Sequence, residues 1–182
     1  MIILGVCGPA GAGKDTLADY LVDNYGFKKF SFTDILIKEC KKRGLEPTKE
    51  NLSKLGDEMR KKGGMDVLAK RLWNEIEEEN GDRIVIPNFR SPQEVEYIKY
   101  KAASLNGKVA FYLIMITAPP ETRFSRLKTG ESFEQFLDRD RRDFNYKKMG
   151  EVFEMADFYV SNSGTYEELY SLLDDLMVKL LE

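Results

Sequence analysis

Five short runs of apolar residues divide the chain, and segments with helical patterns separate them. The runs are Ile2 to Cys7, Lys28 to Phe32, Arg83 to Ile86, Val109 to Thr117 and Asp157 to Ser161. The fourth run is almost continuously apolar, which is typical of a central strand buried on both faces. Regular alternation of strands and helices predicts an α/β fold, with a five-stranded parallel sheet covered by helices on both faces.

Capping patterns mark several helix starts. The clearest is Ser91-Pro92-Gln93-Glu94, in which Ser91 caps the helix, Pro92 takes the first helical position and Glu94 bonds back to the cap. The same pattern recurs from Ser132 to Gln135 and from Thr165 to Glu168. A capping role is sufficient to explain Glu94, and a role in a functional site is the alternative.

The chain reads as one domain of 182 residues, because no repeat and no Ser/Gly-rich linker divides it. We place its core at residues 1–32, 81–118 and 151–182. Two helical excursions interrupt this core: the first excursion covers residues 33–80 and the second excursion covers residues 119–150. In an open parallel sheet, segments at the carboxyl ends of strands line the ligand crevice, so we expect both excursions to border a site.

Composition excludes several classes of function. The 28 basic and 31 acidic residues are mixed along the chain, which gives no footprint for polymeric nucleic acid. No apolar stretch approaches the roughly 20 residues of a membrane span, and the apolar start reads as a strand, not as a signal peptide. Two cysteines form no disulfide framework, so a soluble cytoplasmic protein is expected. Without histidine, the chemistry must use Lys, Arg and carboxylates.

A glycine-rich segment follows the first strand and opens an amphipathic helix, predicted from Lys14 to Tyr25. We call this segment the phosphate loop; its residues are Gly8, Pro9, Ala10, Gly11, Ala12, Gly13, Lys14, Asp15 and Thr16. Backbone N–H groups of such a loop face phosphate oxygens, and the helix N-terminus adds about half a positive charge. Lys14 is expected to reach the β- and γ-phosphates. The motif, between a strand and a helix, predicts ATP binding.

Asp15 stands where this motif usually has a Ser or Thr whose hydroxyl binds Mg²⁺. A carboxylate beside a triphosphate is repelled unless a cation lies between them, so Asp15 is a candidate Mg²⁺ ligand, directly or through a water. The third strand leads into Asn88 and lacks the aspartate that often helps to hold the metal. The alternative is that Asp15 only stabilises the positive end of the helix.

Candidate acceptor contacts follow the second and third strands. Arg90 lies after the third strand, where a guanidinium can bind the phosphate of an acceptor with two hydrogen bonds. Asp34 starts the helix after the second strand and is placed to orient an acceptor hydroxyl or phosphate; helix-start electrostatics is its alternative. We add Arg60 and Asn88 to the predicted acceptor contacts.

The second excursion contains a helix, predicted from Ser132 to Tyr146. Its apolar stripe consists of Phe133, Phe136, Leu137 and Phe144. Arg139 and Arg142 fall on the opposite face, about 60° apart, which suits a clamp on the transferring phosphoryl group. A solvated face with weak ion pairs is the alternative. Asp140 lies within the stripe, and a buried carboxylate needs a partner, so we expect it to pair with Arg123 or Arg126 and to be structural.

These motifs resemble those of the nucleoside monophosphate kinase group. The resemblance rests on the phosphate loop, on Asn88-Phe89-Arg90 with Glu94, and on the tail from Ala156-Asp157 through Asn162 and Gly164. The chain is most similar to archaeal adenylate-kinase-related proteins, in segments 43–51, 64–71, 90–96 and 139–142. The tail is also similar to dephospho-coenzyme A kinases, and the loop with Asn88 and Arg90 to phage-type deoxynucleotide kinases.

The resemblance implies transfer of the γ-phosphate from ATP, with Mg²⁺, to a small nucleotide-like acceptor. It also implies an acceptor-binding region, which we place in the first excursion, and a mobile lid, which we place in the second. We predict catalytic roles for Lys14, Arg90, Arg139 and Arg142, and donor contacts from Arg126 and Asn162. AMP, CMP, deoxynucleotides and dephospho-coenzyme A stay open as acceptors, as does the oligomeric state. A regulatory NTPase module without an acceptor is the alternative.

Overall fold

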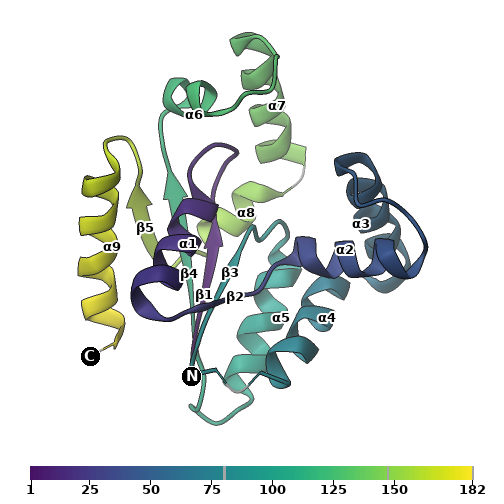
Figure 1. Cartoon of the computed structure of the whole chain (residues 1–182), viewed down its shortest axis with the longest axis vertical. Coiled ribbons are helices and arrows are strands. Elements are labelled where there is room, and N and C mark those ends of the chain that lie inside the picture. Colours follow the sequence, from purple (N-terminus) through teal and green to yellow (C-terminus); the bar gives the residue numbers. More distant parts are fainter. Residues whose placement is uncertain (80, 147, 182) are drawn as a thin grey trace.

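The computed structural model describes residues 1–79, 81–146 and 148–181, and it has the predicted α/β architecture (Figure 1). Five parallel strands form one sheet in the order β2-β3-β1-β4-β5. The strands are β1 (Ile2–Cys7), β2 (Lys28–Lys29), β3 (Arg83–Pro87), β4 (Ala110–Thr117) and β5 (Phe158–Ser161). Because β1 is the central strand, the loop that follows it emerges at the middle of the carboxyl edge. Residues 80 and 182, where we place the ends of two segments, lie outside the described part.

Helices cover both faces of this sheet. Their bounds are α1 (Lys14–Tyr25), α2 (Phe32–Lys42), α3 (Lys49–Gly63), α4 (Val67–Glu77), α5 (Pro92–Ala103), α6 (Pro120–Arg126), α7 (Phe133–Tyr146), α8 (Met149–Glu154) and α9 (Tyr166–Leu181). The predicted helix from Lys14 to Tyr25 is confirmed residue for residue as α1. None of the helices in the described ranges is long and apolar enough to cross a membrane.

Alternating side chains of β1 supply both layers of the core. Ile3 and Cys7 pack in the cluster that includes side chains of α4, α5 and α8. Leu4 and Val6 pack in the other cluster, with side chains of α1 and α9. All four are fully buried, as the period of two along a strand requires for a sheet covered on both faces. The predicted two-sided sheet is therefore confirmed.

The three predicted capping boxes form. At the start of α5, Ser91 Oγ accepts a hydrogen bond from the Glu94 N–H at 3.2 Å, and the Glu94 carboxylate accepts one from the Ser91 N–H at 3.3 Å. The corresponding reciprocal bonds join Ser132 with Gln135, before α7, and Thr165 with Glu168, before α9. Local sequence thus fixes where these helices begin.

Two details of the predicted elements are wrong. The second strand does not continue to Phe32, because Ser31 Oγ accepts a hydrogen bond from the Thr33 N–H at 3.0 Å and caps α2. Phe32 is therefore the first residue of a helix. The apolar stripe of α7 does not continue to Phe144, which is 53% exposed. The other strands agree with prediction to within one residue at each end.

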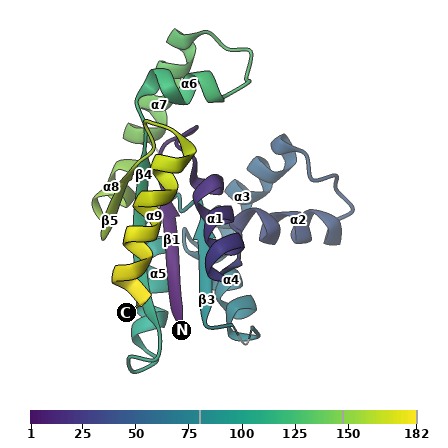
Figure 2. The same cartoon turned by 60° about the vertical axis from the view of Figure 1, so that its left-hand side comes forward.

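The two excursions leave the sheet in different directions. In Figures 1 and 2, α2 and α3 project to one side of the sheet, whereas α6 and α7 stand beyond the carboxyl end of β4. The predicted boundary at residue 150 cuts through α8, whose Val152 and Phe153 are buried in the same cluster as Ile3. The part of the second excursion that stands apart from the sheet is therefore α6 and α7.

Candidate functional site

The phosphate loop connects β1 to α1 at the centre of the sheet. Gly13 precedes α1 with a φ of 101°, a left-handed conformation that residues other than glycine rarely adopt. A Cβ atom at this position would lie 2.4 Å from Nδ2 of Asn162. No side chain caps the N-terminus of α1, so its first N–H groups are available to an anion.

Lys14 lies across the phosphate loop. Its ammonium group donates hydrogen bonds to the carbonyl oxygens of Gly8 and Pro9, both at 2.9 Å. Burial lowers the pKa of Lys14 to about 8; the neighbouring charge of Asp15 opposes this shift and that of Arg90 adds to it. The ammonium is thus held at the loop and remains largely protonated at neutral pH.

Two donor contacts are predicted outside the loop, Asn162 and Arg126. Asn162 contacts the backbone of the loop, and Arg126 contacts Asn162. Asn162 is 5% exposed, and its Nδ2 donates to the carbonyl oxygen of Ala12 at 2.9 Å. Because the C=O and N–H of a trans peptide point in opposite directions, this bond turns the Gly13 N–H away from Asn162. Arg126 Nη2 donates to the main-chain oxygen of Asn162 at 3.0 Å. In this structure Asn162 thus orients the backbone of the loop; its predicted contact with the donor stays a prediction.

The segment after β3 brings Asn88 and Arg90 next to the phosphate loop. Asn88 has a φ of 70°, and its N–H donates to the carbonyl oxygen of Val6 at 2.9 Å, which ties this segment to the end of β1. Arg90 is exposed, and its guanidinium makes no hydrogen bond or ion pair with any residue that the structure describes. Its charge lowers the pKa of Lys14. Two cations therefore lie near one another at adjacent strand ends.

Glu94 is fully buried and does more than cap α5. Its Oε2 accepts from the N–H of Arg90 at 3.0 Å, and its Oε1 accepts from Nη2 of Arg60 at 2.9 Å. Arg60 belongs to α3, so the carboxylate ties the first excursion to the segment that carries Arg90. The side chain of Arg60 is only 17% exposed. Asp34, the remaining predicted acceptor contact, is exposed in the first turn of α2.

Asp15 has a partner that the sequence does not reveal. Lys29 Nζ lies 3.2 Å from Oδ1 of Asp15 and 2.9 Å from Oδ1 of Asp19. The Asp15 side chain is 66% exposed, and such an exposed pair is weak. Within residues 1–79, 81–146 and 148–181, no group of three or more acidic or thiol side chains gathers as a metal site. A Mg²⁺ ion at Asp15 would therefore take its other ligands mainly from nucleotide phosphates and water.

The expected partner of Asp140 is present in the second excursion. Nη1 and Nη2 of Arg123 donate to the two carboxylate oxygens of Asp140, at 2.7 and 2.6 Å. Arg123 is 4% exposed. The prediction that Asp140 pairs with an arginine of the preceding helix is confirmed, with Arg123 as the partner.

Arg139 and Arg142, the predicted lid arginines, differ in their surroundings. The Arg139 guanidinium lies 5.6 Å from the ring centre of Phe136 and pairs with Glu131 at 2.8 Å. It therefore lies partly against the apolar stripe, which corrects its placement on the opposite face. Arg142 is exposed and donates to the main-chain oxygen of Asp138 at 3.3 Å. In the described part of the chain, no hydrogen bond or ion pair joins either arginine to the phosphate loop.

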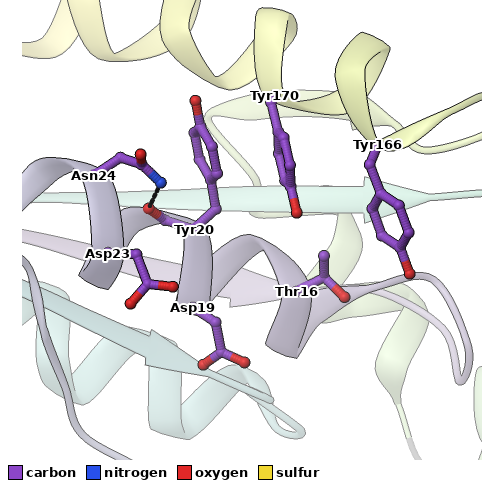
Figure 3. A pocket seen from close by; sticks show the side chains of 7 residues that line it. All are labelled: Thr16, Asp19, Tyr20, Asp23, Asn24, Tyr166 and Tyr170. Carbon is purple, nitrogen blue, oxygen red and sulfur yellow. Dashed lines mark hydrogen bonds between the residues drawn. The ribbon is translucent and has the colours of Figure 1, made fainter.

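A groove between α1 and α9 begins beside the phosphate loop (Figure 3). The rings of Tyr20 and Tyr170 stack with their centres 4.1 Å apart, and the ring of Tyr166 follows 6.0 Å from that of Tyr170. Tyr166 ends this row and is 63% exposed. The groove has a volume of about 520 Å³ and is lined by Thr16, Asp19, Tyr20, Asp23, Asn24, Tyr166 and Tyr170. Thr16 thus belongs to both the phosphate loop and the groove.

The predicted site residues include neither Lys29 nor the row of tyrosine rings, Tyr20, Tyr170 and Tyr166. Tyr166 and Tyr170 are four residues apart on α9, which is a signal that they share a face. That signal does not say which helix lies opposite. The ion pair of Lys29 with Asp15 depends on β2 lying at the edge of the sheet next to β3, a long-range arrangement without a local pattern.

Comparison with known proteins gives a family and a fold. The model of a family described as AAA domain matches residues 7–144. A UPF0200/UPF0201 protein of Archaeoglobus fulgidus is 35% identical over 99% of this chain and 56% of its own length, so the chain spans about half of that relative. A UPF0200 protein of Methanocaldococcus jannaschii is 31% identical over 100% of this chain and 91% of its own length.

Among solved structures, two shikimate kinases have the same fold. The enzyme of Bacteroides thetaiotaomicron matches with a TM-score of 0.65 at 12% identity, over 100% of this chain and 99% of its own. That of Aquifex aeolicus matches with a TM-score of 0.59 at 16% identity, with the same coverage. At these identities the likeness concerns the fold alone, which is that of P-loop kinases.

Proposed function

Since the chain belongs to the AAA-domain family and to the UPF0200 proteins, we propose that it is an ATP-dependent kinase of a small nucleotide-like acceptor. The observation that carries this proposal is the pair of cations at adjacent strand ends. Lys14 lies across the phosphate loop after β1, and Arg90, whose guanidinium has no partner among the described residues, follows β3. Transfer between two phosphates requires cations of this kind on the donor and acceptor sides.

The donor binds through the phosphate loop. Loop N–H groups and Lys14 hold the phosphates. Asn162 holds the carbonyl group of Ala12 in the loop, and Arg126 in turn holds the main chain of Asn162. Thr16 leads from the loop into the groove of Figure 3, where the exposed ring of Tyr166 offers a stacking surface for the base of the nucleotide. This surface supports a nucleotide donor over a simple phosphate ester.

The acceptor binds on the side of the first excursion. Arg90 meets its phosphate, and Asp34, Arg60 and Asn88 line its approach. The buried Glu94 holds both the guanidinium of Arg60 and the main chain of Arg90, so it ties the acceptor side of the first excursion to the segment that carries Arg90. Within the kinase class we favour the adenylate-kinase-related proteins, on the motifs at residues 43–51 and 90–96, and keep dephospho-coenzyme A kinase as the alternative.

Catalysis follows from positioning and charge neutralisation. The transferring phosphoryl group spreads negative charge over its oxygens, so cations fixed around it lower the barrier. Lys14 and the main chain of Arg90 are in place before substrates arrive. Arg139 and Arg142 reach the phosphates only when the second excursion closes as a lid.

Asp15 is the candidate ligand of Mg²⁺, an ion that neutralises the donor phosphates when bound. To reach the metal the carboxylate must leave Lys29, and separating an exposed pair costs little. We expect Asp15→Asn to shift the Mg²⁺ titration of phosphoryl transfer to higher concentration, and Asp15→Ser, which restores a hydroxyl, to keep substantial activity. Identical Mg²⁺ titrations for Asp15→Asn and the parent protein would leave Asp15 as a helix-start residue only.

The proposed function is tested by a panel of acceptors with ATP and Mg²⁺, in which ADP release is measured. We expect ATP consumption to depend on one class of acceptor, with one phosphorylated acceptor formed for each ATP consumed. With AMP that product is itself ADP, so two ADP appear for each ATP. ADP that accumulates at the same rate with and without every acceptor would support the regulatory NTPase module instead. AMP, CMP, deoxynucleotides and dephospho-coenzyme A form the first panel, with shikimate as the test of the likeness in fold.

A further inference from the structure

Arg123 contacts three separate parts of the molecule. Its Nε donates to the carbonyl oxygen of Ala118 at 3.0 Å, and Ala118 directly follows β4. Its Nη1 donates to the carbonyl oxygen of Ala10, in the phosphate loop, at 3.2 Å. Its two terminal nitrogens hold Asp140 of α7. A single buried guanidinium thus joins the sheet, the phosphate loop and the second excursion.

The main chain of Arg123 also lies against the phosphate loop. A Cβ atom on Gly11, which has a φ of 77°, would lie 2.7 Å from the carbonyl oxygen of Arg123. Only glycine fits such a contact without a shift of one backbone or the other. The phosphate loop and α6 are therefore in direct contact through both the backbone and the side chain of Arg123. A shift in the position of either one strains these contacts.

On the other side of Arg123 lies the part of α7 that carries the lid arginines. Phe136 is fully buried, with the Arg123 guanidinium 5.2 Å and the Arg139 guanidinium 5.6 Å from its ring centre. Asp140 follows Phe136 by one helical turn, so both residues meet Arg123 from the same face of α7. The position of Arg139 therefore depends on contacts that Arg123 makes.

The geometry points to Arg123 as a positioning residue that couples the phosphate loop to the lid, so that a nucleotide bound in the loop also fixes α7. This inference rests on the proposed function. The Ala10 carbonyl and the Gly11 N–H belong to one peptide plane and point in opposite directions. When Arg123 holds the carbonyl, the Gly11 N–H is turned to the opposite side of the loop, and an anion bound there restrains the same plane. Such coupling acts equally in both directions.

The test compares two variants that remove the same charge from α7. Asp140→Asn breaks the charged pair with Arg123, whereas Asp138→Asn removes an exposed carboxylate that lies 3.5 Å from Nη1 of Arg141. We expect the Kd of ATP with Mg²⁺, measured by calorimetry on the full chain, to rise at least about fivefold for Asp140→Asn. For Asp138→Asn we expect a change of less than about twofold.

Hydrogen exchange of the α7 amides supplies a readout that a purely structural role would not move. In the parent and in Asp138→Asn, ATP is expected to slow exchange in α7; in Asp140→Asn this effect of ATP is lost. Because Asp140→Asn leaves a buried cation without its charged partner and so destabilises the fold, Arg123→Lys serves as a second variant. It keeps a positive charge for Asp140 but loses the fork that also reaches Ala10 and Ala118.

Arg123→Lys is expected to fold, to keep α7 protected without ATP and to lose the additional protection by ATP. The coupling is overturned if folded Arg123→Lys binds ATP with the parental Kd and shows the parental slowing in α7. It is also overturned if the parent binds ATP and exchange in α7 is the same with and without it. By contrast, ATP binding that slows α7 without acceptor-dependent ADP release would overturn the proposed phosphotransfer and leave the coupling intact.

Discussion

The two excursions from the sheet are held to the molecule in opposite ways. The first is part of the core: α4 alone buries Leu68, Ala69, Leu72, Trp73 and Ile76 against the sheet side of the molecule. In α6 and α7, among the side chains that the structure describes, only Arg123 and Phe136 are buried. Apolar packing holds the first excursion to the core, whereas hydrogen bonds of Arg123 and Arg126 to main-chain oxygens contribute strongly to holding the second.

The difference suggests that one fold can assign acceptor binding to the first excursion and lid closure to the second. Apolar burial has no preferred direction but is lost only when much surface is exposed, so the first excursion is suited to a fixed acceptor site. A few charged contacts are short-range and replaceable by contacts to phosphates, so α6 and α7 are suited to movement.

Aromatic residues of the two excursions should differ most in their contribution to stability. Trp73→Ala removes a fully buried side chain from α4, and we expect it to lower the free energy of unfolding by about 3–5 kcal/mol. Phe144→Ala, in α7, removes a ring that is 53% exposed and should cost less than about 1 kcal/mol. Urea denaturation of both variants measures the contrast, and equal costs would contradict it.

Lys14→Ala tests whether both excursions serve one phosphate loop. In the proposed reaction the ammonium contacts developing charge on the transferring group, so its loss should lower phosphoryl transfer at least about 100-fold. The fold should persist, because the hydrogen bonds of the Lys14 ammonium to described residues go to carbonyls of its own loop. Steady-state ADP release, with circular dichroism as the control for folding, measures this. A loss below about tenfold in folded protein would refute the donor site.

Arg90 in the core and the lid arginines Arg139 and Arg142 should affect different kinetic constants. Arg90 follows a core strand, and Glu94 holds its main chain before substrate arrives. Arg90→Ala should therefore raise the KM of the acceptor about tenfold, the cost of one hydrogen bond to a charged group. Arg139→Ala and Arg142→Ala should instead lower kcat by a similar factor, because their contacts form on closure. The contrast fails if the lid variants keep the parental kcat, or if Arg90→Ala leaves the acceptor KM unchanged.

A smaller effect should follow from the pKa of Lys14, which burial lowers to about 8. At pH 8.5 only about a quarter of the lysine is protonated, so ATP affinity should be about fourfold weaker than at pH 7. The unfolded chain binds more protons than the folded one between pH 8 and 10.5, so the contribution of Lys14 to stability rises over that range. Weaker binding at pH 8.5 is therefore not a sign of unfolding. Calorimetry at both pH values measures it, and Lys14→Ala should show no such change.

Local patterns were sufficient for most of the fold. Alternating apolar runs located the strands, and the capping boxes at Ser91, Ser132 and Thr165 located three helix starts, because each depends on residues within one turn. The second strand was extended too far, since the apolar Phe32 fits a strand as well as a helix. Periodicity alone does not separate the two over so few residues.

The site was predictable where one element carried the signal. The phosphate loop is contiguous in sequence. The ion pair of Asp140 is predictable because a carboxylate in an apolar stripe requires a partner. The contacts of Asn162 with Ala12 and of Arg123 with Ala10 join residues more than a hundred positions apart. Nothing local encodes such contacts, so they follow only from the packing of the sheet.

The short second strand has a consequence for how copies of this protein meet. A sheet ends in rows of unpaired N–H and C=O groups, which invite pairing with a strand of another chain. At the β2 end this row is two residues long, and both are lysines held in ion pairs, Lys28 with Glu79 and Lys29 with Asp15 and Asp19. A strand from a second molecule would find almost no backbone to pair with and a cluster of paired charges, so this edge of the sheet resists aggregation.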